Sequence, residues 1–189
     1  MADIDGGPAA ACTRLLSEAF AHEPATAWIC GESQAARRNW FAATLRAHGT
    51  VPGARRVTLT DAGQVLAAAV LTPPGVVPRP RAQAVWAAQV ALGCGPGAVR
   101  RTVRYVRATE AWASDDAWTL EFIGVDPRHR GRGAARRLLN HLLADITGPH
   151  PVHLTTADPG NVALYRHFGF AVDHRIRVGP LTTTAMSHR

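Results

Sequence analysis

Apolar residues fall into short blocks along the chain, and several of these blocks have the length and composition of β-strands. Residues 55–60 and 64–72 flank Asp61-Ala62-Gly63, which is typical of a hairpin turn. The apolar run from Trp118 to Val125 is long enough for a buried central strand. Later blocks predict three further strands, over residues 152–156, 171–178 and 181–187.

Other blocks place apolar residues three and four positions apart, which predicts helices. Residues 134–143 carry four leucines in this pattern. Another helix is expected to begin at Pro159, after the N-cap Asp158, and to end at Gly169. The remaining helical blocks are residues 9–20, 33–48, 81–92 and 97–113. Together these elements predict an α/β (α+β) protein in which helices flank a mixed sheet.

The length and apolar content fit a single domain. At 189 residues and 47% hydrophobic residues the chain can bury a full core, so we expect one domain over residues 1–189. We expect no membrane segment, because no apolar run reaches spanning length, and the N-terminal residues lack the features of a signal peptide. Three widely spaced cysteines are typical of a reducing cytoplasm, and the scattered histidines predict no metal site.

A loop rich in glycine and arginine follows the central strand. It begins after Asp126-Pro127, contains Gly131 and Gly133, and runs directly into the helix predicted from Ala134. Glycines let consecutive backbone N–H groups face one ligand, and the start of a helix presents unpaired N–H groups at the positive end of its dipole. This arrangement predicts an anion site that fits a pyrophosphate.

The spacing of the loop narrows the choice of anion. A nucleotide P-loop requires a lysine, and this chain contains none. A dinucleotide fingerprint requires a third glycine at position 136, which is Arg136 here. The stretch 130–135 (RGRGAA) instead resembles the acyl-CoA pyrophosphate loop of the GCN5-related N-acetyltransferase (GNAT) superfamily. This resemblance implies that the diphosphate of acetyl-CoA binds along Arg130, Gly131, Arg132, Gly133, Ala134 and Ala135.

A second motif lies at the distance expected from the first. Residues 161–170 (NVALYRHFGF) resemble the superfamily's second motif, in which the asparagine binds the pantetheine or phosphate arm and the tyrosine lies near the thioester sulfur. The resemblance therefore implies roles for Asn161 and Tyr165. It also implies that the backbone of Ile123 and Val125 pairs with the pantetheine amides. The fold it implies has about six to seven strands, of which the first is short or missing, because only Asp3-Ile4-Asp5 precedes the first helix.

Two side chains are candidates for proton transfer. Tyr165 is the candidate general acid for the departing thiolate, and the alternative is an aromatic ring that fills the buried side of its helix. Glu121 is the candidate general base, because a carboxylate in an apolar strand is costly to bury unless it faces a cleft. Period-2 alternation predicts that Glu121 shares a face with Ile123, and that Phe122 faces the other way. The alternative for Glu121 is a structural ion pair with an arginine.

The layout of the whole chain also resembles the branch of the superfamily that contains puromycin N-acetyltransferase. In that branch the loop predicted over residues 20–28 borders the acceptor, which makes Glu23 and Trp28 candidates for substrate binding. Helix termination and core packing explain these two residues equally well. The branch contains enzymes with varied acceptors, so resistance to an antibiotic does not follow.

The charge of the chain adds one further consideration. The net charge is +7, which is compatible with nucleic-acid binding. Many of the arginines surround the glycine loop, however, where the phosphates of coenzyme A supply a ligand, and no DNA-reading motif is present. The arginines near the loop are Arg128, Arg130, Arg132, Arg136 and Arg137.

The resemblance therefore predicts an acetyl-CoA-dependent N-acetyltransferase that acts on a primary amine of a small molecule. The alternatives are an enzyme that uses another acyl chain or a protein amine, and a non-catalytic regulator or scaffold that binds acyl-CoA. The sequence leaves the oligomeric state open, including a homodimer.

Overall fold

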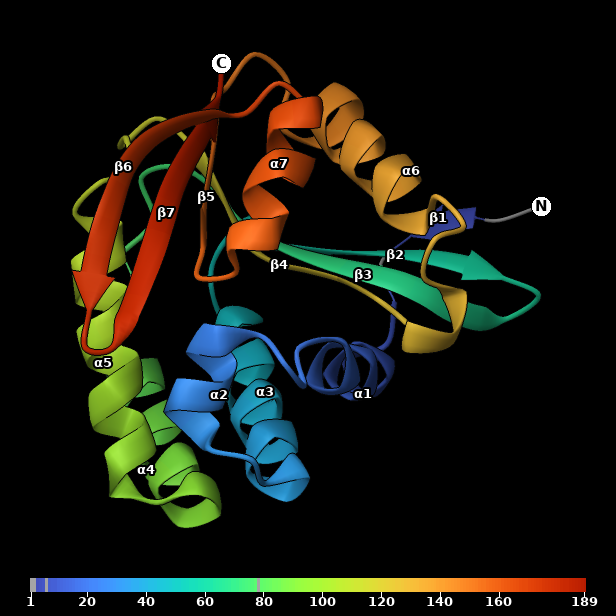
Figure 1. Ribbon diagram of the computed structural model, residues 1–189. Helices are drawn as coiled ribbons and strands as arrows, with labels where there is room; N and C mark the ends of the chain where they lie inside the picture. The colour runs from blue at the N-terminus through green and yellow to red at the C-terminus, as the bar shows by residue number, and fades with distance from the viewer. Residues whose placement is uncertain (1–2, 6, 78) are drawn as a thin grey trace.

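The computed structural model describes residues 3–5, 7–77 and 79–189. In this part of the chain the strands form one seven-stranded mixed sheet, ordered β1-β2-β3-β4-β5-β7-β6 (Figure 1). All neighbouring strands are antiparallel except β4 and β5, which are parallel. The strands are β1 (Asp3–Asp5), β2 (Arg55–Asp61), β3 (Gln64–Thr72), β4 (Trp118–Val125), β5 (Val152–Thr156), β6 (Ala171–Val178) and β7 (Leu181–His188).

The predicted mixed sheet with flanking helices is confirmed, and so is the short first strand, which has three residues. The helices are α1 (Ala9–Ala19), α2 (Pro24–Cys30), α3 (Gln34–His48), α4 (Pro80–Cys94), α5 (Pro96–Glu110), α6 (Ala134–His141) and α7 (Pro159–His167). A 3-10 turn (Pro127–His129) precedes α6, and a π-helical turn (Leu142–Ile146) continues it.

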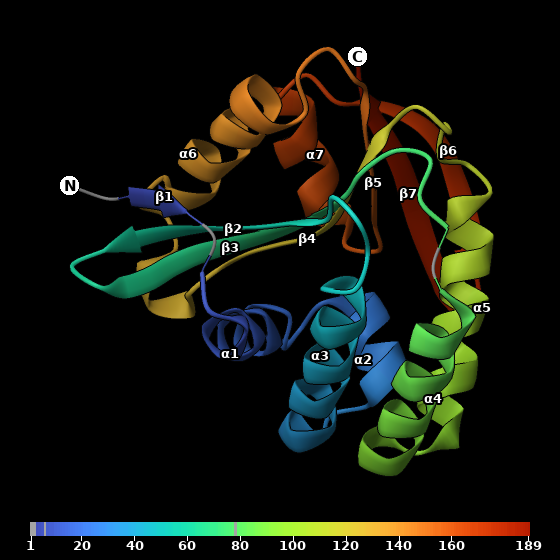
Figure 2. The same ribbon diagram turned by 180° about the vertical axis from the view of Figure 1, so that it is seen from behind.

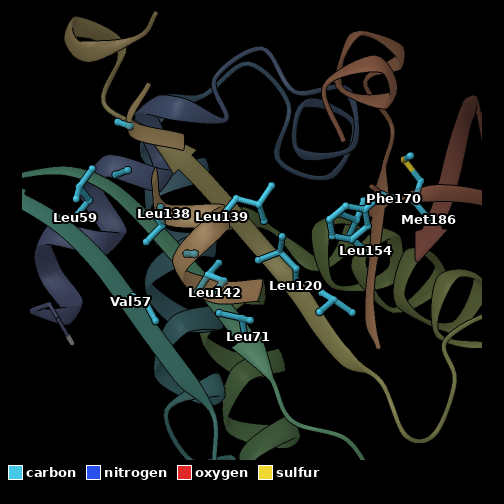
Figure 3. Close-up of a cluster of buried hydrophobic side chains, with 14 residues drawn as sticks. Val57, Leu59, Leu71, Leu120, Leu138, Leu139, Leu142, Leu154, Phe170 and Met186 are labelled. Atoms are coloured by element: carbon cyan, nitrogen blue, oxygen red, sulfur yellow. The ribbon is translucent and has the colours of Figure 1, made fainter. Parts of the chain in front are cut away.

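Helices cover both faces of the sheet. Helices α6 and α7 lie on one face, whereas α1 to α5 gather on the other, as both views show (Figures 1 and 2). Under α6 and α7, apolar side chains of every strand from β2 to β5 and of β7 form one buried cluster (Figure 3). Leu138, Leu71 and Met186 are fully buried within it. Burial of apolar area on both faces is the main source of stability for such a three-layer arrangement.

The second buried cluster lies between the sheet and helices α1 to α5. Phe41 is at its centre, and its ring packs edge-on against the rings of Phe20, Trp40 and Phe122 at centroid distances of 5.0 to 5.5 Å. Helix α1 approaches β4 closely at Gly124, where an added Cβ would lie 2.9 Å from the Cβ of Ala19. Gly124 is therefore a packing requirement of this layer.

Strands β4 and β5 diverge soon after they begin. They pair only at Trp118 with Val152 and at Thr119 with His153. From position 120 onward β4 is paired with β3 but has no pairing with β5 in the described residues. The two halves of the sheet thus open away from each other on either side of a gap.

The prediction for the face of Glu121 was wrong, because β4 contains a bulge. Val70 pairs with Phe122 and Leu71 with Leu120, so the register shifts and Glu121 has no partner on β3. An extra residue in one strand reverses the alternation beyond it. Leu120 and Ile123 consequently pack against the same cluster, whereas Phe122 packs against the cluster of α1 to α5.

The loop predicted over residues 20–28 was also wrong in part, because helix α2 begins within it. Glu23 is the N-cap of this helix, and its carboxylate accepts hydrogen bonds from the N–H of Ala25 and Thr26 and from the Thr26 hydroxyl at 2.7 to 3.1 Å. Pro24 occupies the first turn, where its missing N–H costs nothing. Glu23 and Pro24, which the sequence analysis took as a sign of helix termination, therefore begin helix α2.

Candidate active site

The glycine loop has the backbone conformation that an anion site requires. Gly131 and Gly133 have φ angles of 76° and 77°, and a Cβ added to either would have no atom within 4 Å. The need for glycine is thus conformational rather than steric. Gly133 is the N-cap of α6 without any side-chain cap, and the side chain of Ala134 is buried in the core. The N–H groups at the start of α6 are left for a ligand.

Side chains around this loop hold it in place. The Arg130 Nη2 donates a hydrogen bond to the carbonyl oxygen of Ala19 at 3.0 Å, which ties the loop to the last residue of α1. Asp126 accepts hydrogen bonds from the backbone N–H, the Nε and the Nη2 of Arg128. These bonds to Arg128 lower the pKa of Asp126 to about 2. Arg132 is exposed and Ala135 half-buried beside the open helix start.

The second motif lies on the neighbouring helix, as predicted. Asp158 caps α7 by accepting a hydrogen bond from the Gly160 N–H at 2.9 Å, and Gly169 follows its end with a φ of 85°. Asn161 lies in the first turn, half-buried, and its side chain has no hydrogen-bond partner among the described residues. Tyr165 follows one turn later, so both side chains lie on one side of α7.

Tyr165 is packed into the sheet rather than exposed on its helix. It contacts the cluster to which Ile123 and Val125 of β4 also belong, and its ring lies edge-on to Phe170 at a centroid distance of 5.7 Å. Burial, together with the negative charge of Glu23, raises the pKa of Tyr165 to about 12. The phenol is therefore protonated at neutral pH and is a hydrogen-bond donor.

Glu121 faces the opposite side of the sheet, toward α5. The Thr72 hydroxyl donates a 2.6 Å hydrogen bond to one of its carboxylate oxygens, and no ion pair reaches it within the described residues. The structure therefore does not contain the arginine pair that was the alternative for this residue. Surrounding protein raises the pKa of Glu121, as does the like charge of Glu110, and Thr72 opposes both. The Glu121 side chain is nevertheless exposed to solvent.

Glu23 and Trp28 come to the same region through α2. Glu23 lies close enough to Tyr165 and to Tyr105 of α5 to raise the pKa of both phenols. Trp28 packs on the turn between β6 and β7, where a Cβ added to Gly179 would lie 2.9 Å from its Cζ2. Helix α2 and this turn thus form one wall beside the gap.

The sequence analysis did not identify Tyr105. This residue of α5 is half-buried, and its pKa is raised by burial, lowered by the nearby hydroxyls of Thr155 and Thr183, and raised by Glu23. Tyr105 and Tyr165 are the only tyrosines of the chain, and only the fold brings both near Glu23.

Other features lie away from this region or are absent from it. A pocket of about 300 Å³ is formed by α3, α4 and the residues before α4, with Trp86 and Arg46 in its wall, and shares no residue with the gap between β4 and β5. No group of three or more metal-binding side chains occurs among the described residues. None of the described helices is long and apolar enough to cross a membrane.

Comparisons with known proteins agree with this geometry. The profile of the acetyltransferase (GNAT) family matches residues 18–170. A search of curated proteins finds no match. Among solved structures, the histone acetyltransferase HPA2 and related acetyltransferase of Corynebacterium glutamicum superposes with a TM-score of 0.73 at 18% identity, covering 98% of this chain and 94% of that one.

Two further structures are similar at lower scores. The ribosomal-protein-S18-alanine N-acetyltransferase of Escherichia coli has a TM-score of 0.60 at 17% identity, covering 100% of this chain and 93% of that one. The polyamine N-acetyltransferase of Drosophila melanogaster has a TM-score of 0.57 at 17% identity, covering 99% and 98% of the two chains. At these identities the structures support the fold, whereas the family follows from the profile match over most of the chain. The chain therefore belongs to the acetyltransferase (GNAT) family, whose donor is acetyl-CoA, and is an N-acetyltransferase.

Proposed function

We propose that this enzyme transfers the acetyl group of acetyl-CoA to a primary amine of a small molecule, and that residues 1–189 act as one catalytic domain. The observation that carries the proposal is the gap between β4 and β5, which begins after the pairs at Trp118 and Thr119 and lies beside the glycine loop. One side of this gap suits a donor, and the other side carries the ionisable groups that an acceptor needs.

The donor would lie along β4 and end at the glycine loop. The β4 backbone at Ile123 and Val125 has no partner from β5, which supports pairing with the pantetheine amides. The open N–H groups of the helix start and the two left-handed glycines support binding of the diphosphate. The loop residues assigned to the diphosphate are Arg130, Gly131, Arg132, Gly133, Ala134 and Ala135. Asn161 would donate its free amide to the same arm.

The reaction requires a neutral amine and a stabilised leaving thiolate. The amine nitrogen attacks the thioester carbonyl, the carbon–sulfur bond breaks, and one proton leaves the nitrogen. Glu121 would accept that proton directly or through water, and Tyr165 would donate a hydrogen bond to the thiolate. Since the Tyr165 pKa is about 12, complete proton transfer to a thiolate whose conjugate acid has a pKa near 8.5 is uphill. Its hydrogen bond therefore matters more than its proton.

The importance of Glu121 depends on the amine. An alkylamine with a pKa of about 10.4 must lose a proton at pH 7 at a cost of about 4.6 kcal/mol. An α-amino group near pKa 8 costs only about 1.4 kcal/mol by the same arithmetic. A strongly basic acceptor thus needs the base most.

Assignment to the branch of puromycin N-acetyltransferase is also part of the proposal. The residues that support it are Glu23 and Trp28, which form the wall next to the gap together with the β6–β7 turn. Fold relatives act on a protein alanine and on polyamines by their names, so the fold leaves the acceptor open. The contact of Trp28 in α2 with Gly179 in the β6–β7 turn supports a small acceptor.

The test combines calorimetry with CoA and thiol release from acetyl-CoA across a panel of primary amines, with product masses recorded. We expect CoA to bind and at least one amine to be acetylated. Binding without thiol release supports the alternative of a non-catalytic regulator, and absence of CoA binding removes the proposal altogether. The Glu121→Gln variant should lose more activity with an alkylamine than with an α-amino compound.

A further inference from the structure

The cavity of about 300 Å³ is formed by helices α3 and α4 and the residues that precede α4. These helices lie on the opposite side of the sheet from α6 and α7 (Figures 1 and 2). None of the residues that line the cavity belongs to the glycine loop or to the gap between β4 and β5. The volume is at the lower end of the range for small-molecule sites, and the reaction proposed above gives it no role.

One part of the cavity wall is apolar. It is formed by Ala43 and Ala47 of α3 and by Ala82, Val85 and Trp86 of α4. Val85 is 48% exposed, so this apolar wall is in contact with water. An apolar group that displaces the water from such a concave surface gains the free energy of hydrophobic contact.

Two hydrogen bonds between α3 and α4 hold the wall in shape. The indole Nε1 of Trp86 donates to the Thr44 hydroxyl at 3.1 Å, and the Arg46 Nη1 donates to the Oε1 of Gln89 at 2.6 Å. The first bond fixes the orientation of the indole ring, and the second keeps the Arg46 guanidinium beside the cavity. A site whose side chains are already held in place loses less conformational entropy when a ligand binds.

Three guanidinium groups line the same cavity, those of Arg46, Arg79 and Arg81. The side chains of Arg79 and Arg81 make no hydrogen bond or ion pair within the described part of the chain. Residues 33–60 and 62–109, which contain the whole cavity wall, include no aspartate or glutamate. The positive charge at the cavity therefore has no internal counter-charge, and an anionic group of a ligand would supply one.

We infer that this cavity binds a small amphiphilic carboxylate, with its apolar part against Trp86 and Val85 and its carboxylate at Arg79 and Arg81. A guanidinium group matches the two oxygens of a carboxylate. A neutral apolar molecule would leave the arginines without a counter-charge, and an inorganic anion would leave the apolar wall in water. A ligand that has both parts satisfies both. Because the cavity is separate from the donor site, the protein should hold this ligand and CoA at the same time.

The test uses 4-phenylbutanoate, its neutral analogue 4-phenylbutanamide, and butanoate, each titrated by calorimetry into protein saturated with CoA. We expect 4-phenylbutanoate to bind with a Kd of about 1 mM or lower. The amide should bind about tenfold more weakly or worse, because it lacks the charge. Butanoate should also bind about tenfold more weakly or worse, because it lacks the phenyl group. Equal binding of acid and amide, or of 4-phenylbutanoate and butanoate, overturns the inference.

Titration without CoA separates this inference from the proposed function. We expect the same Kd for 4-phenylbutanoate with and without CoA, because the two sites share no residue. A Kd that rises in proportion to the CoA concentration would place the carboxylate at the donor site and overturn the inference. If CoA itself does not bind, the titration of the protein alone still tests the cavity.

Variants locate the binding. The double variant Arg79→Gln, Arg81→Gln should raise the Kd for 4-phenylbutanoate about tenfold or more and leave that for the amide within about twofold. Arg100→Gln, Arg104→Gln is the matched control, because it removes the same charge from exposed positions of α5 and should change neither Kd. Val85→Gln should weaken acid and amide alike, by about threefold or more. An unchanged Kd in the first double variant, or an equal rise in both double variants, overturns the inference.

Discussion

Tyr165 shows how one residue acquires chemistry from its surroundings. Its sequence neighbours place it on a helix, but the sheet and Glu23 determine its acidity. Burial makes the phenolate costly, and the pKa of about 12 keeps the hydroxyl proton on the ring. In the proposed mechanism such a group would stabilise the departing thiolate by a hydrogen bond without giving up its own proton.

Replacing Tyr165 with phenylalanine tests this role. The ring and its contact with Phe170 stay, and only the hydroxyl is lost. We expect kcat to fall by about a hundredfold, the lower end of the range for a positioned acid, with little change in KM for acetyl-CoA. Steady-state thiol release measures both constants. Undiminished turnover would show that the tyrosine only fills space.

Asp126 gives a prediction about stability and pH. Its pKa is lowered to about 2 through its bonds to Arg128, so the folded state holds the charged form more strongly than the unfolded chain. The Asp126→Ala variant should lose about 1 kcal/mol of unfolding free energy at neutral pH, as for loss of an N-cap. A lowered pKa contributes stability that is present above the unfolded value and is lost as the pH falls toward 2.

Urea denaturation from pH 6 down to about 2.5 measures the difference between wild type and Asp126→Ala. The difference should shrink steadily over the acidic part of this range. A difference in unfolding free energy that stays constant to the lowest pH would mean that the charge of Asp126 contributes nothing and that its shape alone matters. Because the Arg128 side chain is 67% exposed, added salt should also reduce the difference in unfolding free energy between wild type and Asp126→Ala.

Among the elements, the loop and its helix were predictable because local chemistry determines them. Residues 131–143 contain two glycines followed by the apolar pattern of an amphipathic helix, and both features can be recognised in the sequence. Helix α2 was missed because Glu23-Pro24 is read as a helix end, although a carboxylate N-cap with proline after it also begins a helix. The bulge at Glu121 could not be predicted, since nothing in β4 itself shows where β3 skips a partner.

The glycine loop yields a prediction about binding of CoA. Gly133→Ala forces a side chain into the left-handed region at a cost of about 1 kcal/mol and shifts the N–H groups at the start of α6. We expect the Kd for CoA to rise about tenfold or more, because several amides share one diphosphate. Calorimetry with CoA measures it.

Gly75→Ala is the matched control for the loop variant. Gly75 also has a positive φ, of 68°, with no atom within 4 Å of an added Cβ, but it follows the other end of β3. It should lose similar stability and keep the wild-type Kd for CoA. A rise in Kd of equal size in both variants would mean that the effect comes from general destabilisation.

At the scale of the whole molecule, helix α1 links the central strand β4 to the glycine loop. Helix α1 packs on Gly124, and its last residue accepts the hydrogen bond from Arg130. The fold class and both motifs could be predicted from periodicity and resemblance. The juxtaposition of α2, α5 and the β6–β7 turn could not, because it depends on contacts between residues far apart in the chain, such as Trp28 with Gly179.

The Gly124→Ala variant tests the packing of α1. The new methyl group would meet Ala19 at 2.9 Å and the Cδ2 of Leu16 at 3.0 Å, so helix and sheet must separate. Overpacking of this kind costs about 1 to 3 kcal/mol of unfolding free energy. Each kcal/mol lost lowers Tm by roughly 2 to 4 °C. In Gly49→Ala the φ of −63° is ordinary and the nearest atoms are 3.4 Å away, so its Tm should stay near wild type. Equal thermal melts for both variants contradict the packing argument.

The two residue pairs that join β4 to β5 leave the enzyme with a sheet that is incomplete by itself. An extended donor with amide groups at strand-like spacing can lie in the missing place and bond to the free backbone edge. In the proposed complex the donor would complete the sheet in the manner of an eighth strand, so the protein should be least mobile while it holds acetyl-CoA and most mobile just after coenzyme A departs.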